Sequence, residues 1–197
     1  MMNMKNYATL IIVGVIVLFC MGGCVTYNSL VSKQEVATQA FSDVQAAYQR
    51  RSDLLPNAAK IVKAYAKHEN ETFKEITEAR AKASQITVDA NNLTPEKMKQ
   101  YQEAQGDVSN ALGKLMMVSE QYPDLKASKN FEDLQVQVEG CENRINYARQ
   151  KYNQTVQEYN VSVRSFPNNI LSGVFGFQTM TKFEAEKGAD KAPNLDI

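Results

Sequence analysis

Residues 131–166 read FEDLQVQ VEGCENR INYARQK YNQTVQE YNVSVRS F, and each group of seven begins with an apolar or aromatic residue. A small or apolar position follows three residues later in each group: Leu134, Cys141, Ala148, Thr155 and Ser162. This 3-4 spacing places one continuous stripe along one face of a helix, as in helices that pack in coiled-coil fashion. We therefore predict one helix over this stretch, about 54 Å long at a rise of about 1.5 Å per residue.

Other parts of the chain carry the same helical spacing. From Leu55 to Ala90 the 3-4 stripe is unbroken, and Glu69 is its one charged position. Shorter apolar stripes over residues 27–51 and 98–122 predict two more helices. Turns are predicted where capping residues and prolines interrupt the pattern, because proline disfavours helical backbone in the residue before it. These turns are Ser52–Asp53, Asp89–Leu93 followed by Thr94 as the helix cap, Tyr122–Pro123 and Phe166–Pro167. The predicted fold class is all-α, with an up-down-up-down antiparallel four-helix bundle of coiled-coil type.

The N-terminal part predicts a membrane anchor. Residues 6–32 contain no charged side chain, and the centre of this stretch, Leu10–Phe19, is strongly apolar. About 20 helical residues cross a hydrocarbon core of about 30 Å, so we predict a transmembrane signal-anchor over residues 7–26. Two alternatives remain open. One is a cleaved signal peptide; the other is a lipoprotein, in which Met21–Cys24 resembles a lipobox and Cys24 carries the lipid.

The predicted organisation has four parts along the chain. Residues 1–6 form a short flank, residues 7–26 the transmembrane signal-anchor, residues 27–183 the helical bundle and residues 184–197 a flexible C-terminal tail. The tail is charged and then contains proline, as is common for chain ends that pack against nothing. A length of 197 residues favours one folded domain.

Composition argues against several classes of function. Lys and Arg number 22, as do Asp and Glu, so the net charge is zero and no nucleic-acid partner is expected. Three cysteines and one histidine, His68, do not supply a usual zinc shell. No grouping of residues indicates a catalytic, cofactor-binding or metal-binding site. We therefore expect no enzymatic activity, no cofactor and no small-molecule substrate.

A series of short motifs, in the same order throughout the chain, resembles the LemA family. The motifs are Tyr27–Val31, Arg50–Asn57, Ala64–Glu69, Thr77–Ala81, Tyr122–Ala127, Glu142–Ile145, Tyr152–Asn153, Tyr159–Asn160 and Phe166–Pro167. The resemblance implies a bacterial, membrane-anchored antiparallel helical bundle without an established enzymatic activity, and it transfers no catalytic or cofactor residue. Two departures are Phe41, where such sequences often have Trp, and Gly22–Cys24, which is not a family feature.

The charges on either side of the apolar stretch predict the orientation of the chain in the membrane. Lys5 precedes the stretch and Lys33 is the first charge after it, so the positive-inside rule puts the N-terminus in the cytoplasm. With the resemblance, this predicts a single-pass protein of the bacterial cell (inner) membrane whose bundle lies on the extracytoplasmic side.

The expected function is a non-enzymatic scaffold or partner-binding protein of the cell envelope. Its partner would be an unidentified protein or a second copy of the chain. In the predicted topology, the turns after residues 51 and 122 lie far from the membrane and form a distal tip. The partner surface expected there comprises Arg50, Arg51, Asp53, Tyr122, Asp124 and Lys126. The alternative is a protein that acts on the membrane surface, in remodelling or in a stress response.

The C-terminal apolar segment is the basis of this alternative. Residues 170–183 carry seven large apolar side chains, too many to be left in water. One interpretation is that the segment contacts the membrane; the other is that it plugs the end of the bundle. The residues expected to make the membrane contact are Ile170, Leu171, Val174, Phe175 and Phe177.

Polar residues on predicted core faces raise two further questions. Glu69 on an apolar stripe requires a partner, and a pair with Arg80 or Arg144 would set the register of the helices. Tyr152–Asn153 and Tyr159–Asn160 recur seven residues apart and so share one helix face. The expected role of this face is a core seam with tyrosine hydroxyls at its edge, and a ligand-binding stripe is the alternative.

Overall fold

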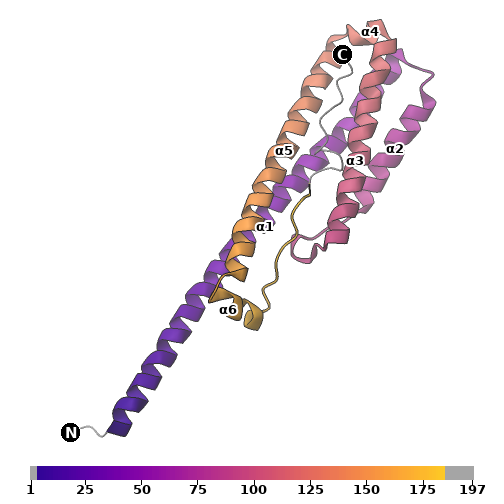
Figure 1. Cartoon of the computed structure of the whole chain (residues 1–197). Coiled ribbons are helices and arrows are strands. Elements are labelled where there is room, and N and C mark those ends of the chain that lie inside the picture. Colours follow the sequence, from indigo (N-terminus) through magenta and orange to yellow (C-terminus); the bar gives the residue numbers. More distant parts are fainter. Residues whose placement is uncertain (1–3, 185–197) are drawn as a thin grey trace, which may run out of the picture.

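The computed structural model describes residues 4–184, with side chains described from residue 22 (Figure 1). The helices are α1 (Met4–Tyr65), α2 (Asn70–Gln85), η1 (Ala90–Asn92), α3 (Pro95–Val118), η2 (Ser119–Gln121), α4 (Pro123–Lys126), α5 (Lys129–Arg164) and α6 (Asn168–Phe175). No strand occurs within residues 4–184, so the predicted all-α class is confirmed.

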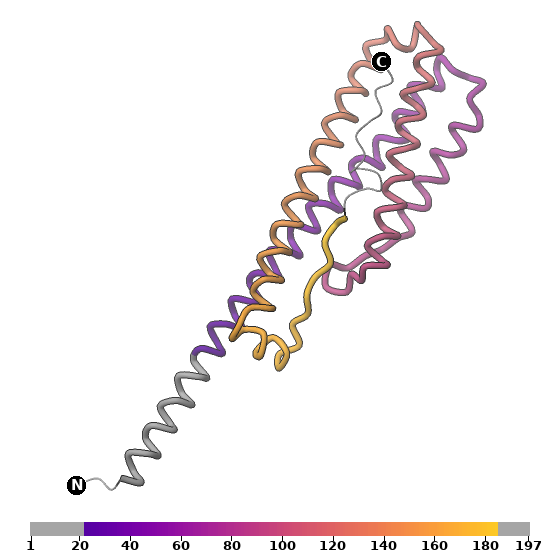
Figure 2. The backbone as a smooth tube through the Cα atoms, viewed as in Figure 1, coloured from indigo at the N-terminus to yellow at the C-terminus, as the bar shows by residue number. Residues whose placement is uncertain are grey.

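The two long helices α1 and α5 form an antiparallel pair that runs the length of the bundle (Figure 1). Helices α2 and α3 pack mainly on each other and cover only the half of this pair that lies away from the N-terminus. In the other half, the extended segment after α6 runs back toward the middle of the bundle, as Figure 2 shows. The chain alternates direction as predicted, but a uniform four-helix bundle is not what the structure shows.

The predicted break at Ser52–Asp53 is wrong, because α1 continues through Pro56 to Tyr65. Proline inside a helix removes one backbone hydrogen bond and costs about 3 kcal/mol. The core offsets this cost, since one continuous stripe of α1 is buried across the expected break. The buried positions keep the 3-4 spacing throughout: Ala37, Phe41, Val44, Tyr48, Arg51, Leu55, Ala58 and Val62. The stripe is unbroken only when Arg51 is counted as a core position.

The long helix predicted from Leu55 to Ala90 is therefore divided. Its first part is the end of α1, the chain reverses over residues 66–69, and its second part is α2. Other predicted boundaries are confirmed. Thr94 caps α3, accepting a hydrogen bond from the backbone N–H of Lys97 at 3.3 Å, and α5 ends at Arg164, just before the Phe166–Pro167 pair.

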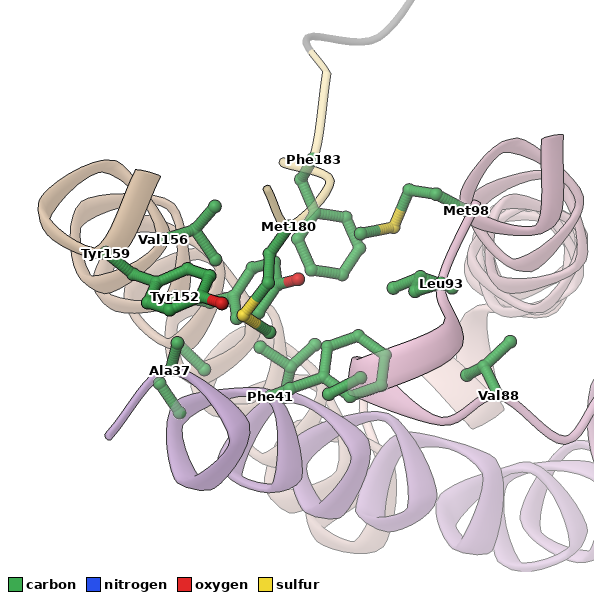
Figure 3. Close-up of a cluster of buried hydrophobic side chains, with 14 of the residues drawn as sticks. Ala37, Phe41, Val88, Leu93, Met98, Tyr152, Val156, Tyr159, Met180 and Phe183 are labelled. Carbon is green, nitrogen blue, oxygen red and sulfur yellow. The ribbon is translucent and has the colours of Figure 1, made fainter. Parts of the chain in front are cut away.

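Two hydrophobic cores follow one another along the bundle. The distal core lies among α1, α2, α3, α4 and α5 and contains Leu55, Val62 and Leu115. The proximal core lies nearer the N-terminus, and Figure 3 shows Phe41 of α1, Tyr152 of α5 and Phe183 from the segment after α6 converging there. Cys141 is buried in α5, as expected for a cysteine on an apolar face.

The predicted membrane span lies mostly outside the described side chains. Residues 7–21 belong to the helical backbone of α1, but their side chains are not described. Among the residues whose side chains the structure describes, no helix has the length and hydropathy that a membrane span requires. The backbone of α1 shows no turn between this region and the bundle.

Buried tyrosines predict a loss of stability at alkaline pH. Burial raises the pKa of Tyr101 and of Tyr152 far above the ordinary value of about 10. In the unfolded chain both phenols ionise near pH 10, whereas the folded chain keeps them protonated. The stability that they contribute is therefore complete below pH 10 and decreases as the pH rises above it.

We expect the absorbance of tyrosinate at 295 nm to rise in two steps during an alkaline titration. Tyr101 and Tyr152 should ionise in the late step, together with the loss of helical circular dichroism. The variant Tyr152→Phe should reduce the amplitude of the late step. Complete ionisation near pH 10 with helicity intact would contradict this prediction.

Candidate functional site

A buried polar cluster around Arg51 lies between the two cores. Nη1 of Arg51 donates to both carboxylate oxygens of Glu142 on α5, at 3.0 and 3.3 Å. Nη2 donates to the backbone oxygen of Gln105 on α3 at 2.6 Å and to its side-chain oxygen at 3.2 Å. The guanidinium also lies 5.1 Å from the ring centre of Tyr48. One side chain thus connects the three helices α1, α3 and α5.

The geometry of this cluster supports a structural role. Both terminal nitrogens of Arg51 bond to neighbouring helices, and Ser109 adds a further donor to Glu142 at 3.4 Å, whereas the buried Nε of Arg51 has no hydrogen-bond partner among the described residues. A groove of about 420 Å³ beside the cluster is lined by side chains of both signs, among them Lys99, Glu103 and Arg149. A groove of mixed charge favours neither an anion nor a cation. The cluster is therefore best explained as a polar layer that sets the register of the helices.

The structure does not bring Glu69 to Arg80 or Arg144. Glu69 lies in the turn before α2, and its carboxylate accepts a hydrogen bond from the Tyr122 hydroxyl at 3.2 Å. Arg80 and Arg144 are exposed on α2 and α5. The unbroken 3-4 stripe hid the turn at residues 66–69, which is why Glu69 was expected in the core. The buried ion pair is formed by Arg51 and Glu142 instead.

The residues predicted for the distal tip separate into two groups. Tyr122, Asp124 and Lys126 lie at the end of the bundle, in and beside α4. Burial and the bond to Glu69 raise the pKa of Tyr122, and the buried Leu125 anchors α4 to the distal core.

The other group, Arg50, Arg51 and Asp53, lies within α1. It is about 20 Å short of the tip, estimated from the helix rise. Arg51 is buried, and the Asp53 carboxylate accepts a hydrogen bond from Gln49 at 2.9 Å. The placement of this group at the tip is wrong because α1 does not end at residue 51.

Two asparagines of α5 hold the extended segment after α6, an arrangement that was not predicted. Asn160 accepts from the backbone N–H of Met180 and donates to its carbonyl, both at 2.8 Å. Asn153 does the same with Phe183, at 2.8 and 2.9 Å. The Tyr152 hydroxyl donates to the carbonyl of Thr181 at 2.8 Å. Three residues of the Tyr–Asn repeat therefore form a row of hydrogen bonds to the chain's own segment 177–184, which we call the strap. The fourth, Tyr159, is buried in the proximal core.

Removing both asparagines should release the strap. The double variant Asn153→Ala and Asn160→Ala loses four hydrogen bonds, each worth about 1 kcal/mol. We expect trypsin to cleave after Lys182 much faster than in the wild type, which mass spectrometry of the fragments would show. The matched control is Asn143→Ala with Asn146→Ala, two exposed positions on α5. Equal cleavage rates in both double variants would contradict the role of the row.

The C-terminal apolar segment combines features of both interpretations. Met180 and Phe183 are buried in the proximal core, and Phe177 packs against it. Leu171 is half-buried, whereas Ile170, Val174 and Phe175 are exposed on α6. Of this segment, only the strap contributes to the proximal core. Helix α6 lies at the end of the bundle nearest the N-terminal segment (Figure 1), and its exposed large side chains are apolar. Cys24, the alternative lipid site, is exposed on α1 near the same end.

Comparisons with known proteins place these features in a family context. The family model described as LemA family matches residues 40–196. Magnetosome protein MamQ of Magnetospirillum gryphiswaldense and MamQ 1 of Paramagnetospirillum magneticum are each 26% identical over 185 residues, covering 83% of this chain. The aligned part is 66% of each MamQ protein, so this chain spans just under two thirds of their length. Protein LemA of Metamycoplasma hominis is 29% identical over 160 residues, covering 81% of this chain and 69% of that protein.

Proposed function

Because this chain belongs to the LemA family, we propose that it is a non-enzymatic, membrane-anchored helical scaffold of the bacterial envelope. The observation that carries the proposal is the continuity of α1. This helix contains the whole charge-free N-terminal segment, residues 6–32, and continues as the central element of the bundle. An anchor joined to the bundle by continuous helix would transmit its orientation to the bundle, because a helix is far stiffer than a loop.

The scaffold would hold its distal tip at a defined distance from the membrane. From Tyr27 to Tyr65, α1 is about 58 Å long, estimated from the helix rise. The tip carries Tyr122, Asp124 and Lys126, which we propose as the surface for a protein partner or a second copy. The single-pass anchor in the inner membrane, with the bundle on the extracytoplasmic side, belongs to the same proposal.

Introducing charged residues into the N-terminal segment tests whether this segment is a membrane anchor. An arginine at the centre of a membrane-spanning helix costs about 3 kcal/mol. We expect the double variant Ile12→Arg with Val15→Arg to leave the membrane pellet after alkaline carbonate extraction, whereas the wild type stays in it. The matched control, Val136→Arg with Tyr147→Arg, adds the same charge at exposed positions of α5 and should stay in the pellet. Extraction of the wild type itself would contradict the proposal.

The lipoprotein form of the anchor makes a different prediction. Cys24 would then be the lipidated first residue of the processed chain. Cys24→Ser would block this processing, so the variant would keep residues 1–23 and have a larger mass than the wild type. With a transmembrane anchor, the wild type and the variant should both keep these residues. The substitution is mild, because Cys24 is exposed and forms no disulfide.

A further inference from the structure

Two charge-free segments meet at the end of the bundle nearest the N-terminal segment. Residues 22–32 of α1 and residues 165–181, which include α6, contain no Asp, Glu, Lys or Arg. These two segments hold half of the large apolar side chains that are exposed in the described part of the chain. Those side chains are Val25, Tyr27, Phe166, Ile170, Val174 and Phe175. We call this set the apolar foot.

Contacts within the protein hold the residues of the apolar foot in place. The ring of Tyr27 contacts those of Phe175 and Phe177, with ring centres 5.1 and 5.5 Å apart and edge-to-face geometry. Gly176 ends α6 in the left-handed conformation (φ 77°), which turns the chain into the strap. The row of hydrogen bonds from α5 then holds the strap. The C-terminal end of helix α6 is thus held against α1 by the aromatic contacts and by the strap that follows it.

The charges that border the foot lie on its bundle side. Lys33 is the first charged residue of α1 after the N-terminal segment, and Arg164 and Lys182 flank the charge-free stretch that contains α6. Lys33 donates to Ser162 on α5, so this boundary crosses between the two long helices. An apolar surface with a polar border and an aromatic contact at its edge is typical of a protein surface at a membrane interface.

We propose that the apolar foot lies in the interface of the lipid bilayer that the N-terminal segment enters. This inference rests on the proposed function, because it requires the chain to be held at a membrane. Tyr27 directly follows the predicted transmembrane segment, residues 7–26, so α6 would reach the bilayer at the depth where α1 leaves it. Together with α1, this second contact would fix the tilt and rotation of the bundle.

A second copy of the chain fits the foot less well. The six exposed side chains of the foot offer roughly 650 Å² of apolar surface, estimated from the size of such side chains. A stable interface between proteins buries about 800 Å² on each partner. A membrane contact has no such minimum, because the anchor already holds the foot beside the lipid.

The absence of tryptophan from the chain allows a direct test. The full-length chain would be reconstituted into phosphatidylcholine vesicles with a single tryptophan, introduced as Val174→Trp in the foot or as Val136→Trp in the control. The two valines are 74% and 66% exposed, so neither substitution disturbs the core. Val136 lies about 40 Å along α5 from its C-terminal end, estimated from the helix rise. Flotation first establishes that each variant is bound to vesicles.

We expect the emission of Val174→Trp to be shifted to the blue and to lose most of its intensity in vesicles with brominated acyl chains. The emission of Val136→Trp should resemble that of tryptophan in water and should not respond to bromine. Equal, water-like emission of the two variants in floating protein would overturn the inference. A blue shift without quenching by bromine would also overturn it, because the foot would then contact protein. Failure of the chain to float contradicts the proposed anchor instead.

Discussion

Replacing Glu142 by alanine is expected to reduce the free energy of unfolding by about 3 kcal/mol. The substitution leaves the guanidinium of Arg51 without its ionic partner, and the Arg51 side chain is only 4% exposed. Breaking a buried ion pair by removing one partner costs about 3–5 kcal/mol. The lower end applies here, because the Glu142 side chain is 35% exposed and water screens part of the interaction. Urea unfolding of the full chain in detergent, followed by circular dichroism, measures the change.

A second ion pair between the same two helices provides the control. Lys151 of α5 and Asp43 of α1 lie 3.0 Å apart with both side chains about half exposed. Asp43→Ala should cost less than about 1 kcal/mol, as is usual for surface pairs. The double variant Arg51→Met with Glu142→Leu should be more stable than Glu142→Ala, because apolar side chains remove the buried charge. Equal costs for Glu142→Ala and Asp43→Ala would contradict the proposed role of the cluster.

Replacing Phe183 by alanine should cost about 3 kcal/mol, because the strap supplies part of the proximal core. The ring of Phe183 is buried, stands edge-to-face with Tyr152 at 5.4 Å and lies under the guanidinium of Arg149 at 5.2 Å. Removing a buried phenylalanine costs about 3–5 kcal/mol, and the end of a chain relaxes more than a helix interior. The same urea unfolding experiment measures the cost.

Phe166→Ala is the matched control for this prediction. It removes the same side chain from a position that is 81% exposed, so the free energy of unfolding should change by less than about 0.5 kcal/mol. If Phe183→Ala were equally mild, the strap would not be part of the core. The strap would then hold α6 in place only through the hydrogen bonds of Asn153 and Asn160.

The helical pattern predicted which parts of the chain are helical more accurately than it predicted the residues at which the helices begin and end. The heptads of residues 131–166 predicted α5 to within a few residues, and the Thr94–Pro95 pair marked the start of α3. The false break at Ser52–Asp53 came from the capping residues and the nearby proline and not from the spacing, whereas the turn missed at residues 66–69 has a different cause. A 3-4 spacing continues through a turn when the next helix packs on the same core, so spacing alone does not locate the reversal. The seven-residue interval from Tyr48 through Leu55 to Val62 did contain the signal that α1 continues.

The candidate sites were harder to predict, because their partners are distant in the sequence. Arg51 and Glu142 are separated by 91 positions, and no local rule pairs them. The Tyr–Asn repeat was visible in the sequence, but its partner is a strap without periodicity that lies 20 to 30 residues farther along the chain. In the structure, some of the apolar residues after Pro167 are buried in the core and others are exposed on the surface. Composition alone does not show which residues belong to which group.

The sequence by itself determined the helical class, the long α5 and the charge-free segments, because helix periodicity and charge are local properties. Tertiary structure decided which polar residues are buried and which apolar residues are exposed. It did so because burial depends on which helices share a core, and those contacts join residues far apart in the chain. The N-terminal charge-free segment and α6 are separate in the sequence, and only the packing of α6 on α1 brings the apolar foot together.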